Sequence, residues 1–136
     1  MSEKNKVTAV LGSQNYYTKI IHRDRTFYVD EPEEDGGGDK ASHPTGYLLA
    51  ALASCTAITL RMYAERKGWD VGEIKVIAEK VEAVSEAGDK TKKLVKNIYF
   101  GNQITEEQQK RLLVIADKCP VSKMLKQETE TYSMIG

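Results

Sequence analysis

Two cysteines, Cys55 and Cys119, are the residues of this 136-residue chain whose type and setting best suit chemistry. Cys55 lies in an apolar run of small residues, and Cys119 precedes a proline at the end of an amphipathic segment. Thiolates are nucleophiles that peroxides and disulfides oxidise, so two thiols brought together could form a redox couple. Two thiols kept apart would be buried apolar residues, because free cysteine is among the most buried residue types. Spacing alone leaves both interpretations open.

The local sequence favours ionisation of Cys119 over ionisation of Cys55. Cys55 is expected in the middle of an apolar helix, where burial raises the pKa of a thiol unless a cation is brought from elsewhere. Cys119 is followed by Pro120, which can begin a new helix with exposed N–H groups. Those groups would favour a Cys119 thiolate.

Other chemistries lack the residues they need. The two cysteines and the two histidines, His22 and His43, form none of the close ligand pairs of zinc sites, so we expect no metal. The glycine run at 36–38 lacks the spacing of a phosphate loop, and Ala41 follows its lysine where Ser or Thr is required. No Gly-x-Ser-x-Gly motif of serine hydrolases is present.

Composition describes one small domain, residues 1–136, with 40% hydrophobic residues and thus enough material for a core. Twenty basic residues balance twenty acidic ones, which gives no electrostatic reason to expect nucleic acid or an anionic membrane as partner. A net charge of zero is compatible with association into an oligomer. We expect no membrane span of about 20 apolar residues and no signal peptide, and hence a cytoplasmic protein.

The first part of the chain is rich in β-formers. Apolar and β-branched residues predict a strand at 7–11 and a hairpin of strands at 16–21 and 26–29. The acidic, glycine-rich stretch 30–39 predicts a mobile loop.

The strongest helix is predicted over residues 44–67, with Gly68 as its C-cap. Its first half carries almost no charge, which predicts burial on all sides.

The second part of the chain alternates strand and helix patterns. Strands at 71–84 and 94–100 should pair as a hairpin across a charged turn at 85–93. Thr105 and Gln108 form a capping box, and the helix that follows points Cys119 inward with the core. Pro120 permits a further helical turn to Lys126, and 128–135 has the composition of a final strand.

Two blocks of sequence identify a family resemblance. The run PTGYLLAALASC at 44–55, continued to Gly68, resembles the central helix of the OsmC/Ohr family, the osmotically inducible and organic hydroperoxide resistance proteins. The run ADKCPVSKML at 116–125 resembles the second cysteine motif of that family. Both blocks occur in the family's order, with an alternating hairpin between them, and the resemblance covers nearly the whole chain.

The resemblance implies an α+β, OsmC-like fold, in which antiparallel sheets wrap around long central helices in an intertwined homodimer. It implies a thiol-dependent peroxidase of oxidative-stress defence that reduces organic hydroperoxides, without a metal or organic cofactor. By resemblance, Cys55 is the peroxidatic cysteine and Cys119 the resolving one. The disulfide they form would be reduced by an external dithiol, which is lipoyl-linked in the better understood family members.

The chain departs from the family pattern where Cys55 would be activated. Thr45 and Gly46 occupy the stretch that carries the family glutamate, and Gln14 stands where one branch carries an arginine. Arg23 and Arg25 are the nearest cationic candidates in the N-terminal half, and they also suit a plain hairpin turn. These departures favour an alternative function: a non-enzymatic OsmC-fold protein that binds a small apolar ligand or senses oxidants. A purely structural protein is a third possibility, and it predicts that no disulfide forms.

Overall fold

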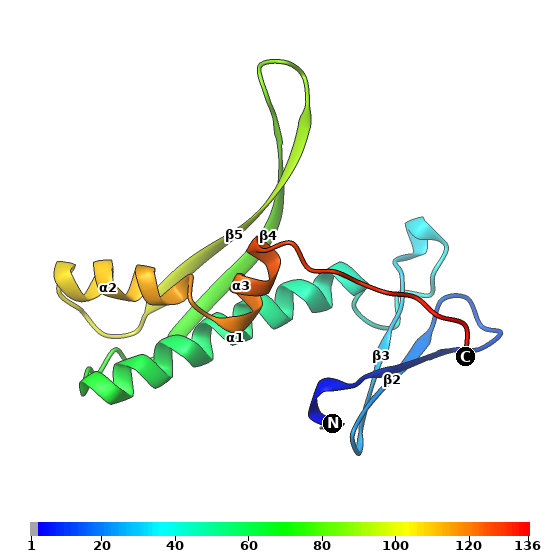
Figure 1. Ribbon diagram of the computed structural model, residues 1–136, viewed down its shortest axis with the longest axis horizontal. Coiled ribbons are helices and arrows are strands. Elements are labelled where there is room, and N and C mark those ends of the chain that lie inside the picture. Colours follow the sequence, from blue (N-terminus) through cyan, green and yellow to red (C-terminus); the bar gives the residue numbers. More distant parts are fainter. Residues whose placement is uncertain (1–2) are drawn as a thin grey trace. The chain divides into compact units, whose positions relative to one another are not determined.

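The computed structural model describes residues 3–136 as an α+β chain that divides into two compact units (Figure 1). One unit extends to Leu48 and the other from Leu49 to Gly136. The predicted α+β class with antiparallel sheets is confirmed. The long helix α1 begins in the first unit and continues through the second.

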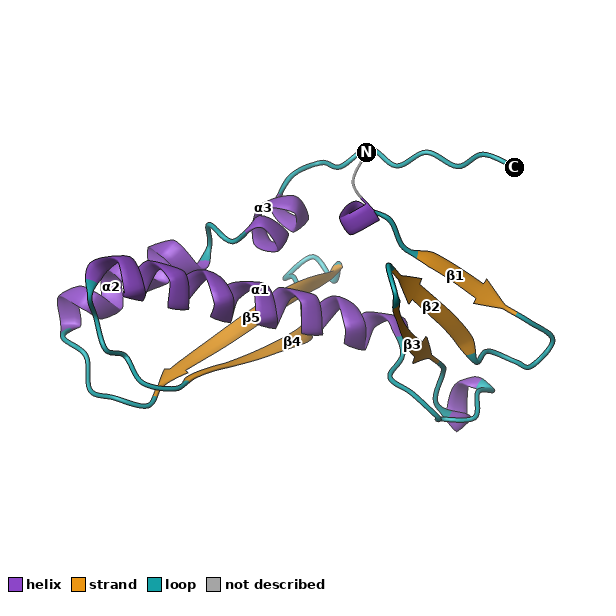
Figure 2. Ribbon diagram, turned by 90° about the horizontal axis from the view of Figure 1, so that it is seen from below, coloured by secondary structure: helices purple, strands orange, loops and turns teal. Residues whose placement is uncertain are grey.

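The first unit is a three-stranded antiparallel sheet in the order β1-β2-β3 (Figure 2). A 3-10 helix at Glu3–Asn5 precedes β1 (Thr8–Leu11), β2 (Thr18–His22) and β3 (Arg25–Val29). The predicted strand and hairpin are confirmed, and His22 pairs with Arg25 at the end of the hairpin. Arg23 adopts a left-handed conformation in this tight turn, with φ of 59°.

The acidic stretch after β3 folds around one buried carboxylate. Asp30 is buried and accepts hydrogen bonds from the backbone N–H groups of Glu31 and Lys40. A 3-10 helix at Glu33–Asp35 lies between them. Burial opposes ionisation of Asp30, but these backbone hydrogen bonds keep the pKa of its carboxyl below the ordinary value. The loop predicted to be mobile is therefore held by its own hydrogen bonds.

The central helix α1 covers Pro44–Lys67 and ends at Gly68, which has a φ of 69°. Both predicted ends are confirmed. Burial on all sides is wrong within this chain, because only one face of the helix is buried. The buried residues recur at helical spacing: Leu52, Thr56, Leu60, Tyr63 and Ala64.

Among the described residues, one helix, α1, is long and apolar enough to cross a membrane by length and composition alone. The sequence-based expectation that no stretch comes near such a span is thus wrong for this helix. The inner face of α1 nevertheless packs into a protein core. Leu60 is fully buried there, beside Val71 and Leu112.

The second unit joins this helix to a long antiparallel hairpin. Strands β4 (Ile74–Val84) and β5 (Lys90–Phe100) pair along their full length. The predicted charged turn is shorter than expected, because the lysines that follow Asp89 continue strand β5. The distal half of the hairpin extends away from the helices, so most of its side chains are exposed and charge is tolerated there (Figure 1).

Two helices complete the second unit. α2 (Glu106–Ala116) begins with the predicted capping box of Thr105 and Gln108, and both of its hydrogen bonds are present. α3 (Pro120–Lys126) begins directly after Cys119, as predicted. The core lies between α1, α2 and the base of the hairpin, and it contains Leu60, Tyr63, Ala64, Val71, Leu112, Ile115 and Ala116.

The final strand predicted at 128–135 is wrong. The chain after α3 has no regular secondary structure, and Tyr132, Met134 and Ile135 are exposed. A strand is stabilised by pairing with a neighbour, and within the described residues this segment pairs with none. Its β-forming composition is therefore insufficient to make a strand in the single chain.

Candidate dithiol site

The second unit brings the two predicted site cysteines into contact. Cys55 lies on α1, and Cys119 is the N-cap residue of α3. The backbone N–H of Val121 donates to the Cys55 thiol, and that of Ser122 donates to Cys119 Sγ over 3.4 Å. A hydrogen bond joins the two thiols themselves. The first turn of α3 thus holds both sulfurs, and Pro120 provides the start of that turn.

Cys55 is the less acidic thiol of the pair. Burial is the main cause, and it raises the pKa of Cys55 above the ordinary value. The neighbouring Cys119 raises it further, while hydrogen bonds from Val121 and Thr59 lower it in part. None of these recorded partners is a cation. Arg61, on the same helix, donates instead to the carbonyl of Gly72 over 2.6 Å.

Cys119 is fully buried, yet it is the more acidic thiol. Burial opposes its ionisation, but hydrogen bonds outweigh that cost and lower the pKa of Cys119 to about 7. They come from the Ser122 hydroxyl, the Thr56 hydroxyl, the Ser122 backbone and the Cys55 thiol. The predicted preference for a Cys119 thiolate is confirmed.

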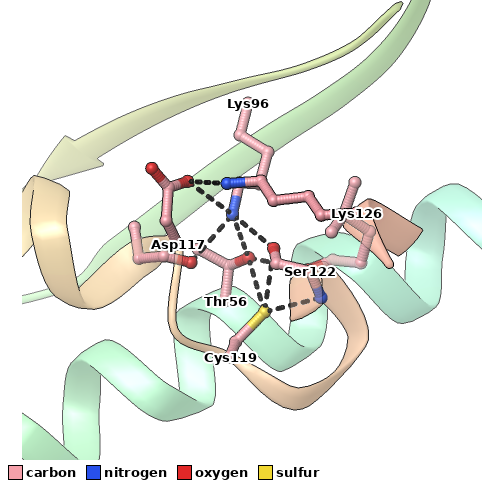
Figure 3. A network of polar contacts seen from close by, with 8 residues as sticks. Thr56, Lys96, Asp117, Cys119, Ser122 and Lys126 are labelled. Carbon is pink, nitrogen blue, oxygen red and sulfur yellow. Dashed lines mark hydrogen bonds and ion pairs between the residues drawn. The ribbon is translucent and has the colours of Figure 1, made fainter. Parts of the chain in front are cut away.

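A lysine connects the hydroxyls that surround Cys119 (Figure 3). Lys96, on β5, donates to Ser122 Oγ over 2.8 Å, to Thr56 Oγ1 over 3.2 Å and to the carbonyl of Ala116 over 2.9 Å. Its ammonium lies 3.8 Å from a carboxylate oxygen of Asp117. We call Lys96, Thr56, Ser122 and Cys119 the lysine network.

A cavity of about 440 Å³ opens beside the lysine network. Asp117 lies at its edge and is shared between Lys96 and Lys126, the latter at 3.4 Å. The lining combines leucines with charged and polar residues: Leu52, Lys92, Leu94, Lys96, Asp117, Ser122, Leu125 and Lys126. The network therefore borders a space that a small molecule can enter.

The other residues singled out in the sequence lie in the first unit. Thr45 and Gly46 form the first turn of α1, and Gln14 lies between β1 and β2. Arg23 and Arg25 lie at the turn between β2 and β3. A role for either arginine near Cys55 stays a prediction.

Sequence reasoning missed Lys96, Thr56 and Ser122. A signal for Lys96 exists in the strand pattern, because alternation places it on the same face of β5 as Ile98 and Phe100, which pack on the core. A lysine at an inward position needs polar partners. The sequence thus indicates that Lys96 has partners without saying which ones.

Taken together, the geometry defines a class: an α+β protein with a paired dithiol between a central helix and a following helical turn. A family model described as OsmC-like protein matches residues 36–133, which is more than half of the chain. The chain belongs to this OsmC-like family. No curated protein matches it.

Solved structures share the fold. A protein of Psychrobacter arcticus described as an osmotic stress induced and detoxification response protein is 26% identical, with a TM-score of 0.72 over 91% of this chain and 88% of that one. The OsmC-like protein of Mycoplasma pneumoniae is 21% identical, with a TM-score of 0.69 over 93% and 89%. An organic hydroperoxide resistance protein, OsmC, of Legionella pneumophila is 16% identical, with a TM-score of 0.67 over 89% and 88%.

Proposed function

We propose that the protein is a thiol-dependent peroxidase that reduces organic hydroperoxides through a Cys55–Cys119 sulfenate and disulfide cycle in oxidative-stress defence. The observation that carries the proposal is the contact between the two thiols, one of them with a pKa lowered to about 7. Family membership supports it, as do the similar structures named for organic hydroperoxide resistance. A cytoplasmic location follows from a chemistry that needs reduced thiols at rest.

Cys55 is the thiol that meets the peroxide, because it is half-exposed in the single chain while Cys119 is fully buried. Its proton passes to the Cys119 thiolate, which is in contact and ionises first. The Cys55 thiolate then attacks the peroxide oxygen and the O–O bond breaks. Cys55 becomes a sulfenic acid, and the alkoxide that leaves takes the proton back from Cys119.

Resolution follows at the same pair of sulfurs. The Cys119 thiolate attacks the sulfur of the Cys55 sulfenic acid, the S–O bond breaks, and hydroxide leaves and is protonated to water. A disulfide joins the two residues, and an external dithiol, such as a lipoyl-linked one, returns it to two thiols.

The outer face of α1 supports a homodimer. Ala51, Cys55, Ile58 and Met62 follow at helical spacing and form one stripe. Ile58 and Met62 are 54% and 62% exposed, which is unusual for the apolar side chains of a central helix. A second copy of the chain would bury this stripe and border Cys55.

The test is hydroperoxide consumption by wild type, Cys55→Ser and Cys119→Ser, with dihydrolipoamide or a monothiol as reductant. Wild type should turn over with the dithiol, and Cys55→Ser should not. Without added reductant, Cys119→Ser should consume one equivalent of peroxide and stop as a sulfenic acid that a sulfenate-specific probe labels. Equal turnover in wild type and Cys55→Ser would overturn the proposal.

The raised pKa of Cys55, and the absence of a cation among its recorded partners, favour the alternative of a ligand-binding or oxidant-sensing protein. Alkylation of Cys55 as a function of pH, in the Cys119→Ser variant of the whole protein, separates the two. An apparent pKa at or above the unperturbed value of about 8.5, with no catalytic peroxide consumption by wild type, supports the sensor. Catalytic consumption by wild type supports the enzyme: a high Cys55 pKa in Cys119→Ser then assigns the base to Cys119, and a clearly lower one shows that Cys55 ionises without it.

A further inference from the structure

Lys96 has its ammonium in the interior of the second unit. Its side chain is only 12% exposed, and all three N–H donors have acceptors: Thr56 Oγ1, Ser122 Oγ and the carbonyl of Ala116. An ammonium can only donate, so both hydroxyl oxygens must accept from it. Each hydroxyl hydrogen is then directed away from Lys96.

The direction of the Ser122 hydroxyl hydrogen follows from the donors and acceptors around Lys96. Among the described residues, the partners of the Ser122 hydroxyl are Lys96 and Cys119 Sγ, the latter at 3.1 Å. A Cys119 thiol can donate to Ser122, which leaves the Ser122 hydrogen without an acceptor. A Cys119 thiolate accepts that hydrogen. The network is therefore better satisfied around the anion than around the thiol.

Thr56 adds a second, adjustable contact. Its hydroxyl lies 2.9 Å from the carbonyl of Leu52 and 3.5 Å from Cys119 Sγ, while its oxygen accepts from Lys96. The hydroxyl hydrogen can turn from Leu52 to the sulfur when a negative charge appears there. Hydrogen bonds to an ionised group are about twice as strong as neutral ones.

We propose that Lys96 is a positioning residue, which holds the Ser122 and Thr56 hydroxyls toward Cys119 so that Cys119 departs as the leaving thiolate when the Cys55–Cys119 disulfide is reduced. This inference rests on the proposed function for the disulfide itself. It assigns the two sulfurs different tasks in reduction: Cys55 is attacked and Cys119 leaves.

The electrons and protons balance in two exchanges. One thiol of an external dithiol loses its proton to solvent and attacks Cys55 Sγ, the S–S bond breaks, and Cys119 takes the electron pair as a thiolate. The second thiol of the reductant then attacks its own sulfur in the mixed disulfide. Cys55 leaves as a thiolate and takes a proton. The reductant departs as a cyclic disulfide and has been oxidised by two electrons.

Burial explains why attack occurs at Cys55. Cys119 has no exposed surface, whereas Cys55 lies half-exposed on the outer stripe of α1. Exchange is faster when the departing thiol is the more acidic one. The exposed sulfur of Cys55 is therefore suited to be attacked, and the acidic sulfur of Cys119 is suited to leave. Among the described residues, Cys55 is the titratable group in contact with Cys119. Lys96 is joined to Cys119 through the Thr56 and Ser122 hydroxyls, and Asp117 pairs with both Lys96 and Lys126.

The test compares Lys96→Met with Lys96→Arg and with Lys93→Met as a matched control. Lys93 is exposed, and alternation places it on the opposite face of β5. Thiolate absorbance of Cys119 is titrated in a Cys55→Ser background. The rate of disulfide reduction by dihydrolipoamide and the reduction potential are measured with both cysteines present. The disulfide is formed with peroxide or, where peroxide fails, with a chemical thiol oxidant.

Lys96→Met should raise the Cys119 midpoint by about one pH unit, since neutral surroundings favour the thiol. Reduction should slow by about threefold, as a thiol-exchange coefficient of about 0.5 requires. Measured at about pH 9, where Cys119 is mostly ionised in both proteins, the reduced form should lose about tenfold in equilibrium constant, so the reduction potential becomes about 30 mV more negative. Lys96→Arg should recover part of each change, and Lys93→Met should show none.

Two failures are distinguishable. If wild type forms no disulfide with peroxide, the proposed function fails, while the titration and the reduction of the chemically formed disulfide still test Lys96. If Lys96→Met leaves the Cys119 midpoint, the reduction rate and the potential unchanged, the role of Lys96 is overturned whatever the fate of the peroxidase. Thermal unfolding of each variant identifies a change that reflects lost structure alone.

Discussion

The two faces of α1 differ in what completes them. The inner face buries Leu52, Leu60 and Tyr63 and contributes Thr56 to the lysine network, so its partners lie within the same unit. The outer stripe carries Ile58 and Met62 into solvent. Cys55 lies on that stripe, yet its sulfur contacts Cys119. One helix thus joins a core formed within one unit to an exposed apolar stripe, which the proposed homodimer would cover.

The inner face gives the largest expected effect. Leu60 has no exposed surface, and Leu60→Ala should lower the free energy of unfolding by about 2–5 kcal/mol, the range for a buried leucine that leaves a cavity. Chemical denaturation at fixed protein concentration measures it. Because the cost comes from the core, it should persist under conditions that dissociate any dimer. A loss below about 1 kcal/mol would contradict the placement of Leu60.

The outer stripe should respond through association instead. Ile58→Glu introduces a charge where the homodimer would exclude water, and the dissociation constant should rise by about 100-fold, roughly 2.8 kcal/mol. Sedimentation equilibrium over a range of concentrations measures the change. Lys93→Glu, on the exposed hairpin, is the matched control and should leave association unaltered. An unchanged dissociation constant for Ile58→Glu would remove the stripe from the interface.

The sequence predicted the inner face better than the outer one. Helical spacing, Gly68 and the capping box at Thr105 are local signals, and the structure confirms each of them. The all-apolar run at the start of α1 predicted complete burial, but a single chain supplies partners for one face only. Composition shows that a segment of the chain is apolar. It does not show whether other parts of the same chain pack against every face of that segment.

The site divides in the same way. The sequence blocks indicated that Cys55 and Cys119 meet, which the structure shows, while their catalytic roles stay a prediction. The helix start at Pro120 indicated the direction of the Cys119 pKa shift, but not the Ser122 and Thr56 hydroxyls that contribute most to it. Lys96 could not be assigned to Cys119, because its partners come from α1, α2 and α3 and meet only in the folded unit. Hydrogen bonds between segments far apart in the chain produce no motif or regular spacing in the sequence.

Opposite pKa shifts of the two thiols should separate in single-cysteine variants. In Cys55→Ser, thiolate absorbance should report a Cys119 midpoint of about 7, and in Cys119→Ser the Cys55 midpoint should lie well above it. A Cys119 pKa lowered by folding adds stability above the pKa of the unfolded thiol, which is lost as pH falls through about 7. The free energy of unfolding of Cys55→Ser should therefore rise from pH 7 toward pH 9, and that of the double serine variant should not.

The smallest expected effect comes from Thr56, where the inner face meets the dithiol. Thr56→Val keeps the shape of the side chain but removes one of the three acceptors of Lys96, at a cost of about 1–2 kcal/mol in the free energy of unfolding. It also removes a donor to Cys119, so the pKa of that thiol should rise. Thr56→Ser retains the hydroxyl and should preserve the Cys119 midpoint despite a slightly looser core. If the valine and serine variants titrate alike, Thr56 belongs to the core alone, and Ser122 is the hydroxyl through which Lys96 reaches the sulfur.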